Sequence, residues 1–385
     1  MKHTKEGAAT VISLGSSLGG RKGVLWRKVE REILEVEPNY SSLYTFSRSK
    51  KDSKEFFLMS LKGKHIGRAA AVVNERPSAR WEEKTGFIDD FVISPNHKHL
   101  AGVLIGRCLA VLKRRKVEEV IVRFQGFPAM VAQEFDQLPP SGLPCNPSWY
   151  AELFERNGFR KHKEWANFRF ELPSRISEAD VSRWKALLAG TRMRARPVNA
   201  RSRTELRQYS DLIYEVLVDH YGYSPSRFMQ SYSFLKHLVV ALLFPVVKFR
   251  IYVLQKDEGD IVGFWSYHPD YQLAARPITR FIKRVWFPFN VLVFVPAVAA
   301  YMFSIRRTKR VNIGAVGLAE RWRRKGFIRA VDYGLQVLIK EGYKELDTGP
   351  VLVENAVLIK LAENFAKRYG VEMERTKYYT MRYKF

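Results

Sequence analysis

The stretch Val316-Gly-Leu-Ala-Glu-Arg-Trp-Arg-Arg-Lys-Gly-Phe-Ile328 decides the fold of this 385-residue chain. It joins an apolar strand predicted at Val311–Leu318 to a helix predicted at Gly326–Glu341. The first N–H groups of a helix are unpaired and point toward an anion, and the helix dipole adds partial positive charge. Gly326 lets the backbone approach a phosphate, and three cations precede it, Arg323, Arg324 and Lys325. The stretch predicts a pyrophosphate-binding turn, with a solvated basic helix cap as the alternative.

The elements around this turn repeat an order found earlier in the chain. In the first half we predict a hairpin, a strand, a helix, a strand, a helix and two short strands, at Glu55–Asn74, Gly86–Ile93, Leu100–Arg115, Glu118–Arg123, Trp149–Arg156 and Phe159–Leu172. In the second half the same order is predicted at Phe249–His268, Val311–Leu318, Gly326–Glu341, Lys344–Thr348, Asn355–Arg368 and Thr376–Lys384. The duplication predicts an α+β fold of two tandem modules, 1–190 and 191–385, each a mixed, mostly antiparallel twisted sheet flanked by helices.

The basic turn resembles the acetyl-CoA loop of the GNAT superfamily of N-acyltransferases, whose pattern is Gln/Arg-x-x-Gly-x-Gly/Ala. Arg323 takes the first position and Gly326 the second, whereas Ile328 stands where Gly or Ala is usual. The resemblance implies that the chain binds acetyl-CoA or a longer acyl-CoA as co-substrate. The residues it implies for this contact are Gly317, Leu318, Arg323, Arg324, Lys325, Gly326, Phe327, Ile328 and Asn355. For Asn355, a plain helix N-cap is the alternative.

The first half resembles the family in a different place. Asn146–Phe159 looks like the GNAT ending in which an Asn-led helix runs into Gly-Phe. The earlier turn, Ser94–Gly102, lacks the Arg-x-x-Gly spacing, so we do not expect this half to bind CoA in the usual way. Together the matching stretches resemble bacterial tandem GNAT proteins, from about residue 55 to the end of the chain.

A GNAT-type transfer implies direct attack of an amine on the thioester. It requires a base for the amine, donors for the oxyanion and an acid for the thiolate. The resemblance implies that backbone N–H groups near Gly317 and Leu318 are the oxyanion donors. The base candidates are Asp89, Asp90, Asp347 and His268. Strand alternation predicts that Asp89 or Asp90 points inward, with an ion pair as the alternative, and for His268 the alternative is helix capping or turn formation. Ala362 stands where many family members have the tyrosine that acts as the acid.

The charge balance is strongly basic, with 65 Lys and Arg against 39 Asp and Glu, a net charge of +26 spread along the chain. Such a surface attracts anionic lipid, nucleic acid or a phosphorylated cofactor. We do not expect nucleic acid, because basic and aromatic residues do not alternate as they do in single-strand binders. No spacing of ligand residues predicts a metal site. Without a predicted signal peptide, we expect a cytoplasmic protein, with peripheral association to the cytosolic membrane face as an option.

Val285–Ile305 carries no charged residue and is flanked by Lys283-Arg284 and Arg306-Arg307. About 20 apolar residues suffice to span a bilayer, but a crossing here would separate strands of one sheet. Two interpretations remain, a buried pair of short helices that covers the sheet, or a hairpin that dips into one leaflet. The second favours an N-acyltransferase for a lipidic amine, such as a sphingoid base or an amino-acid lipid. The alternatives are a soluble N-acetyltransferase for a small amine or peptide, and a non-catalytic tandem binding module.

Overall fold

The protein was analysed as a computed structural model, which describes residues 9–16, 25–26, 52–74, 85–124, 129–131, 146–190, 193–199, 202–213, 215, 248–256, 259–271, 273, 294–319 and 327–385. The strands are β1 Thr10–Gly15, β2 Asp52–Leu61, β3 Lys64–Asn74, β4 Thr85–Ile93, β5 Glu119–Arg123, β6 Met130–Val131, β7 Arg160–Glu171, β8 Met193–Pro197, β9 Arg250–Lys256, β10 Asp260–Pro269, β11 Arg310–Leu318, β12 Glu345–Asp347, β13 Val351–Leu352 and β14 Met373–Lys384. The helices are the 3₁₀ helix η1 Pro95–Leu100 and the α-helices α2 Ala101–Arg114, α3 Tyr150–Arg156, α4 Glu178–Gly190, α5 Arg203–Ile213, α10 Phe294–Arg307, α11 Phe327–Lys340 and α12 Ala356–Tyr369.

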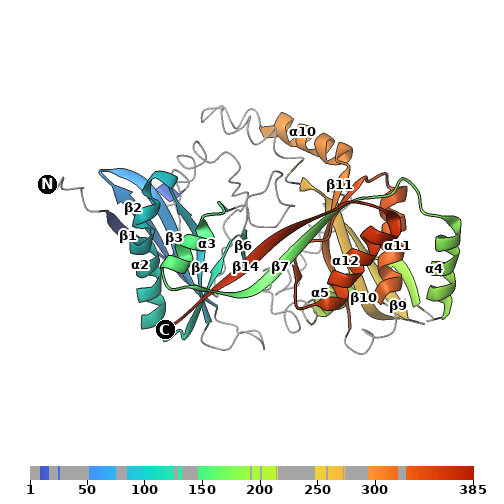
Figure 1. Cartoon of the computed structure of the whole chain (residues 1–385), viewed down its shortest axis with the longest axis horizontal. Helices are drawn as coiled ribbons and strands as arrows, with labels where there is room; N and C mark the ends of the chain where they lie inside the picture. The colour runs from blue at the N-terminus through green and yellow to red at the C-terminus, as the bar shows by residue number, and fades with distance from the viewer. Residues whose placement is uncertain are drawn as a thin grey trace.

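The strands form one continuous, strongly twisted sheet (Figure 1) with the order β1-β2-β3-β4-β5-β14-β7-β12-β11-β10-β9-β8; β6 and β13 pair beside this path, with β14 and β7 respectively. Within the described residues, only β4–β5 and β11–β12 pair in parallel. The other pairings are antiparallel, so the sheet is mixed and mostly antiparallel as predicted. The prediction of a separate sheet in each half was incomplete, because the two halves share one sheet.

The centre of the sheet is built by an exchange of strands. β7, the last strand of the first half, pairs with β12 of the second half, and β14, the last strand of the chain, pairs with β5 of the first. β7 and β14 pair with each other along nearly their whole length and lie side by side at the middle of the molecule (Figure 1). The prediction of two short strands within Phe159–Leu172 was wrong, because one long strand is needed to reach both halves. The division of the chain into modules 1–190 and 191–385 stays a prediction.

Four helices cover the same face of this sheet. Met373 and Met381 lie eight residues apart on β14 and therefore point to one face. Met373 packs against the apolar cluster under α11 and α12, and Met381 belongs to the cluster under α2 and α3. Figure 1 shows these helices in front of the sheet, two over each half. We call this side the helix face; α5 packs on the opposite face, against residues of β9 and β10.

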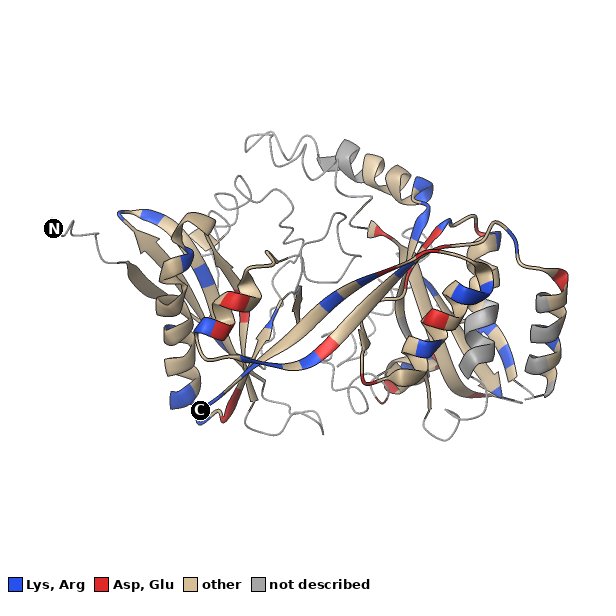
Figure 2. Ribbon diagram, viewed as in Figure 1, with Lys and Arg blue, Asp and Glu red and all other residues tan. Residues whose placement is uncertain are grey.

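The basic surface is not confined to one element. Lys and Arg residues occur on strands and helices of both halves (Figure 2), in agreement with the spread of charge along the sequence. The end of α10 carries Arg306 and Arg307 in its last turn. None of the described helices is long and apolar enough to cross a membrane.

Candidate functional site

In the second half, the two parallel strands of the sheet separate and leave an opening. β11 and β12 pair over three positions only, Arg310 with Glu345, Val311 with Leu346 and Asn312 with Asp347. Beyond them β11 stays with β10, while β12 and then β13 stay with β7. Among the described strands, none pairs with this edge of β11 from Ile313 onward. Unpaired strand edges offer backbone donors and acceptors to a ligand.

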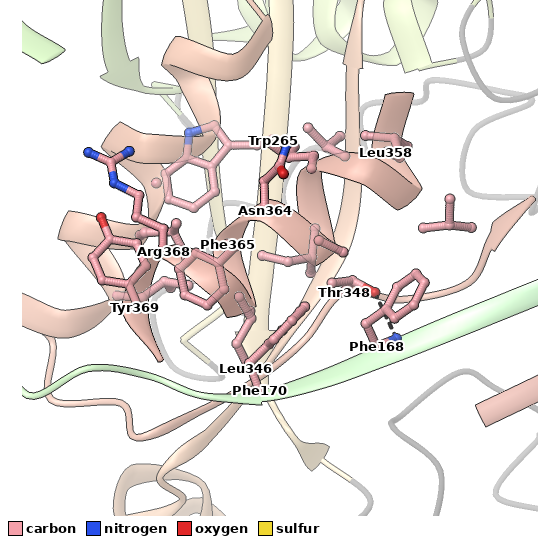
Figure 3. Close-up of a pocket in the computed structure, with 18 residues that line it drawn as sticks. Phe168, Phe170, Trp265, Leu346, Thr348, Leu358, Asn364, Phe365, Arg368 and Tyr369 are labelled. Carbon is pink, nitrogen blue, oxygen red and sulfur yellow. Dashed lines mark hydrogen bonds between the residues drawn. The ribbon is translucent and has the colours of Figure 1, made fainter. Parts of the chain in front are cut away.

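The opening leads into a cavity of about 240 Å³ on the helix face. Phe168 and Phe170 of β7, Trp265 of β10 and Leu346 of β12 form its floor, and residues of α11 and α12 form its walls (Figure 3). A water molecule occupies about 30 Å³ of liquid, so the cavity corresponds to roughly eight waters and is too large for a packing defect. The lining is mainly apolar, which suits a slender ligand with an apolar body.

A few polar groups interrupt this apolar lining. The buried indole N–H of Trp265 has no acceptor within the described residues. Thr348 accepts a hydrogen bond from Phe168 N at 3.1 Å and donates to Gly349 O at 3.0 Å (Figure 3). Arg368 and Tyr369 at the end of α12 stand together, with the guanidinium carbon 5.5 Å from the Tyr369 ring centroid. Thr348, Arg368 and Tyr369 thus supply polar groups to the lining.

The opposite face of the sheet carries a polar row at the point where β11 and β12 separate. Register pairing places His268, Asn312, Asp347, Arg169 and Glu374 next to each other on β10, β11, β12, β7 and β14. Residues directly paired across strands point to the same face. Except for Glu374, these side chains are buried or nearly so. The row lies across the closed end of the opening, with the cavity on the other side of the sheet.

Asp347 is fully buried in this row. Its Oδ1 accepts from Asn167 Nδ2 at 2.9 Å, and its Oδ2 accepts from Arg169 Nε at 3.3 Å. Burial raises the pKa of Asp347, while Arg169 and the Asn167 hydrogen bond lower it in part. A buried carboxyl with a perturbed pKa in a polar cluster is typical of functional sites.

His268 is fixed at the edge of the row. Its ring stacks between Phe249 and Tyr271, with centroids 5.7 and 4.6 Å away, and its Nδ1 lies 2.8 Å from Pro269 O. A carbonyl oxygen only accepts, so Nδ1 carries the proton and Nε2 of the neutral ring carries a lone pair. Burial lowers the pKa of His268, which keeps the ring neutral near pH 7. A side chain at Gly314 would begin 3.6 Å from the His268 Cδ2, so the ring lies beside the open part of β11.

The predicted CoA-contact residues fall partly within the described chain. Gly317 and Leu318 lie on the part of β11 beyond its pairing with β12, and α11 begins at Phe327, followed by Ile328. Arg323, Arg324, Lys325 and Gly326 lie outside the described residues, so the cradle itself stays a prediction. Asn355 caps α12 by accepting from Leu358 N at 3.4 Å, as the N-cap alternative predicted.

The first half has a matching opening that is filled by its own side chains. β4 and β5 pair in parallel from Thr85–Glu119 to Asp89–Arg123 and then separate. Tyr150 of α3, fully buried, lies between Phe91 and Phe124 with ring centroids 5.4 and 5.7 Å away, and its hydroxyl accepts from Ile93 N at 3.1 Å. The edge of β4 at Ile93 is thus bonded by a side chain of the first half itself.

Asp89 and Asp90 therefore do not belong to the site of the second half. Three strands stand between β4 and β12, a separation of about 19 Å at ~4.8 Å per strand. Asp89 is paired with Arg123 at 2.7 Å, the ion-pair alternative. The alternation prediction was wrong here, because Asp90 has a left-handed φ of 52° at a bulge and both carboxylates are half-buried. Burial and the neighbouring Asp89 raise the pKa of Asp90 to about 6.

Sequence reasoning missed three residues of the site. Asn312 was hidden inside a strand read as apolar, although an asparagine there is a signal in itself. Asn167 reaches Asp347 across 180 residues of sequence, so no local pattern reveals it. Tyr369 was not among the predicted site residues, yet it lines the cavity. Among the described residues no cluster of His, Cys, Asp and Glu could hold a metal ion.

Comparison with known proteins places this geometry in a fold. No protein-family model and no curated protein matches the chain. A GCN5-related glucosamine N-acetyltransferase region of a fungal multi-domain GH3 β-N-acetylglucosaminidase is similar over 98% of this chain, with 13% identity and a TM-score of 0.56; the chain spans 38% of that protein's length. A tandem GNAT protein from the clavulanic acid biosynthesis pathway, solved without acetyl-CoA, is similar over 98% of both chains, with 10% identity and a TM-score of 0.51. The chain has the tandem GNAT fold, and the predicted α+β fold class is confirmed.

Proposed function

We propose that this chain is an acyl-CoA-dependent N-acyltransferase whose thioester site is the opening between β11 and β12. The observation that carries the proposal is the cavity of about 240 Å³ that runs from the separated strands between α11 and α12. The tandem GNAT fold supports it, since solved proteins of this fold include N-acetyltransferases. The filled opening of the first half supports a single site per chain.

The residues around the opening fit an acyl-CoA. The mainly apolar cavity fits the slender pantetheine arm. The start of α11 follows directly on the basic turn that the sequence predicts as the pyrophosphate cradle, where Arg323, Arg324, Lys325 and Gly326 would hold the phosphates. The chain length of the acyl group is left to experiment.

The polar row supplies the chemistry on the other side of the opening. The amine nitrogen of the acceptor forms a C–N bond with the acyl carbonyl carbon, the C–S bond breaks, and the sulfur leaves as a thiolate that takes up a proton. The attacking nitrogen loses a proton to His268 Nε2, whose lone pair the Pro269 contact leaves free. Backbone N–H groups on the free edge of β11 stabilise the oxyanion. Ala362, which stands at the usual position of the acid, lines the cavity but carries no proton donor. Tyr369, which also lines the cavity, or a water therefore protonates the thiolate.

For the acceptor, the exposed side of α10 favours a lipidic amine at an anionic membrane surface. Five residues project from one side of the helix, Ala299, Ala300, Phe303, Arg306 and Arg307. Phe303 is 54% exposed, and the Arg307 guanidinium carbon lies 4.0 Å from its ring centroid. This end of the predicted uncharged segment is not fully buried; residues 285–293 lie outside the described residues. An exposed aromatic beside cations is the pattern of interfacial helices.

Calorimetric titration tests the thioester site. The wild-type protein is titrated with acetyl-CoA and with palmitoyl-CoA, beside Ala362→Phe, which fills the cavity, and Gly326→Glu, which places a carboxylate in the predicted cradle. We expect one thioester per chain and at least a tenfold loss of affinity in both variants. Glu363→Phe, on the exposed side of the same helix, is the matched control and should bind as the wild type does. Absence of binding to the wild type would favour a non-catalytic binding module.

Sedimentation with vesicles tests the membrane surface. We expect binding to phosphatidylserine-containing vesicles at physiological salt, and a loss of most of it in Phe303→Ser. Equal partitioning of wild type and variant, or none, would favour a soluble N-acetyltransferase for a small amine or peptide.

A further inference from the structure

Three buried amide atoms next to Asp347 have no hydrogen-bond partner within the described part of the chain. They are both side-chain polar atoms of Asn312 and Oδ1 of Asn167. Each of these asparagines is 2% exposed. An unpaired buried polar group costs about 1–3 kcal/mol, and native proteins normally satisfy such groups with water or a ligand. The atoms lie on the face of the sheet opposite the cavity, where an acceptor would approach a thioester.

The surroundings of these atoms are locally acidic in a strongly basic protein. Arg169 contacts two carboxylates at 3.3 and 3.2 Å, and Arg310 contacts two more at 2.6 and 3.9 Å. The four carboxylates belong to Asp270, Glu345, Asp347 and Glu374. Among the described residues, two guanidinium groups thus contact four carboxylates, so this described set holds more acids than bases. This balance favours a cationic ligand over an anionic one.

On the basis of the function proposed above, we propose that Asp347, Asn312 and Asn167 bind the ammonium group of a primary amine acceptor. An ammonium has three N–H donors and no acceptor. The amide oxygens of Asn312 and Asn167 supply two acceptors, and the Asp347 carboxylate supplies the third together with the countercharge. Each carboxylate oxygen of Asp347 already accepts one hydrogen bond and has a second lone pair available. His268, paired in register with Asn312, is placed to take the proton that turns the bound ammonium into a nucleophile.

The first half contributes directly to this site through the exchanged strand. Asn167 and Arg169 both lie on β7, and they are the two residues that contact Asp347 in the described structure. The half whose own opening is filled therefore positions the acceptor-binding carboxylate of the other half. This gives the first half a role that needs no thioester of its own.

The experiment measures binding of n-octylammonium and of n-octyltrimethylammonium by calorimetry, below their micellar concentrations. The second probe has the same charge and chain but no N–H donor. Asn312→Leu and Asn312→Ala remove the amide, and Thr380→Val, a buried hydroxyl on β14 that accepts from Trp165 Nε1 at 2.9 Å, is the control. We expect the wild type and Thr380→Val to bind n-octylammonium at least tenfold more tightly than the trimethyl probe, and both Asn312 variants to lose at least tenfold. Thermal unfolding of each variant confirms that it is folded.

Acetyl-CoA affinity is measured on the same samples and is expected to be unchanged by the Asn312 substitutions. If neither probe binds the wild type, if the two probes bind equally, or if the Asn312 variants bind as the wild type does, the ammonium site is wrong and the unpaired amides hold structural water. If the ammonium results hold while no protein binds acetyl-CoA, the proposed transferase function fails and the cation site remains.

Discussion

Asn312 and Asp347 are paired in register at the last position before β11 and β12 separate, and their hydrogen bonding is opposite in character. Asp347 is held by Asn167 and Arg169, whereas the described structure offers no partner to either polar atom of the Asn312 amide. One residue of the pair is thus held by hydrogen bonds, and the other has a buried amide that no described residue satisfies.

This contrast predicts that substitutions of Asp347 and Asn312 affect stability very differently. Asp347→Ala leaves Arg169 without its buried partner and should lower the free energy of unfolding by about 3 kcal/mol. Asn312→Leu removes an unpaired amide and should change it by less than ~1 kcal/mol, or raise it. Urea unfolding of both variants measures the two effects. Equal losses in the two variants would mean that Asn312 has a structural partner.

His268 predicts the acid limb of the pH profile. The neutral ring is the active form, so activity falls as the pH drops through the pKa of His268 in the folded protein. Burial lowers that pKa below the ordinary value of about 6.5, so the midpoint of the limb in kcat/KM should lie below this pH. His268→Gln should reduce kcat at least 100-fold and abolish the limb. A limb that persists unchanged in the variant would assign the base to another group.

Asp90 predicts a stability change that depends on pH. The folded-state pKa is raised to about 6, against about 3.9 in an unfolded chain, so this carboxyl destabilises the fold as pH rises through 6. Asn accepts a left-handed φ and carries no charge. Asp90→Asn should therefore gain roughly 1 kcal/mol at pH 8, after allowance for partial exposure, and less at pH 5. Thermal unfolding at both pH values measures the gain in stability, with the exposed Glu363→Gln as the control. An equal gain at the two pH values would contradict the raised pKa of Asp90.

Tyr150 predicts the contribution of one hydrogen bond in the first opening. Tyr150→Phe leaves Ile93 N without its acceptor and should lower the free energy of unfolding by about 1–3 kcal/mol. Tyr343→Phe is a matched control, because the buried Tyr343 hydroxyl has no partner in the described structure and its loss should cost nothing. Urea unfolding compares the two variants. Thioester stoichiometry should stay at one per chain in both, and a second equivalent in the wild type would show that the first opening is accessible.

Local patterns in the sequence predict much of this site. Asp347, in the strand after the predicted cradle helix, and His268, at the end of the hairpin, are both predicted as site candidates, because polar residues at these strand ends are unusual in an apolar pattern. The rule that side chains alternate along a strand fails at Asp89 and Asp90, where a bulge inserts a residue and cancels the alternation.

What the sequence does not reveal is non-local. The pairing of β7 with β12, which brings Asn167 to Asp347, joins segments about 180 residues apart. The sequence of each half, taken alone, predicts a sheet formed within that half. The hydrophobic pattern indicates which face of a strand is buried, but it does not indicate which strand pairs with it. The filled opening is hidden for the same reason, because the role of Tyr150 depends on Phe91 and Phe124 from two different strands.

The exchanged strand β14 has a consequence for how the protein is made. The first half is translated early, yet its strand β5 receives its neighbour only from residues Arg382–Lys384, and Phe385 N donates to Glu118 O at 3.1 Å. Synthesis runs from the N-terminus, so β5 is made long before β14. The β5 edge of the nascent first half therefore stays open until β14 has been made and can pair with it.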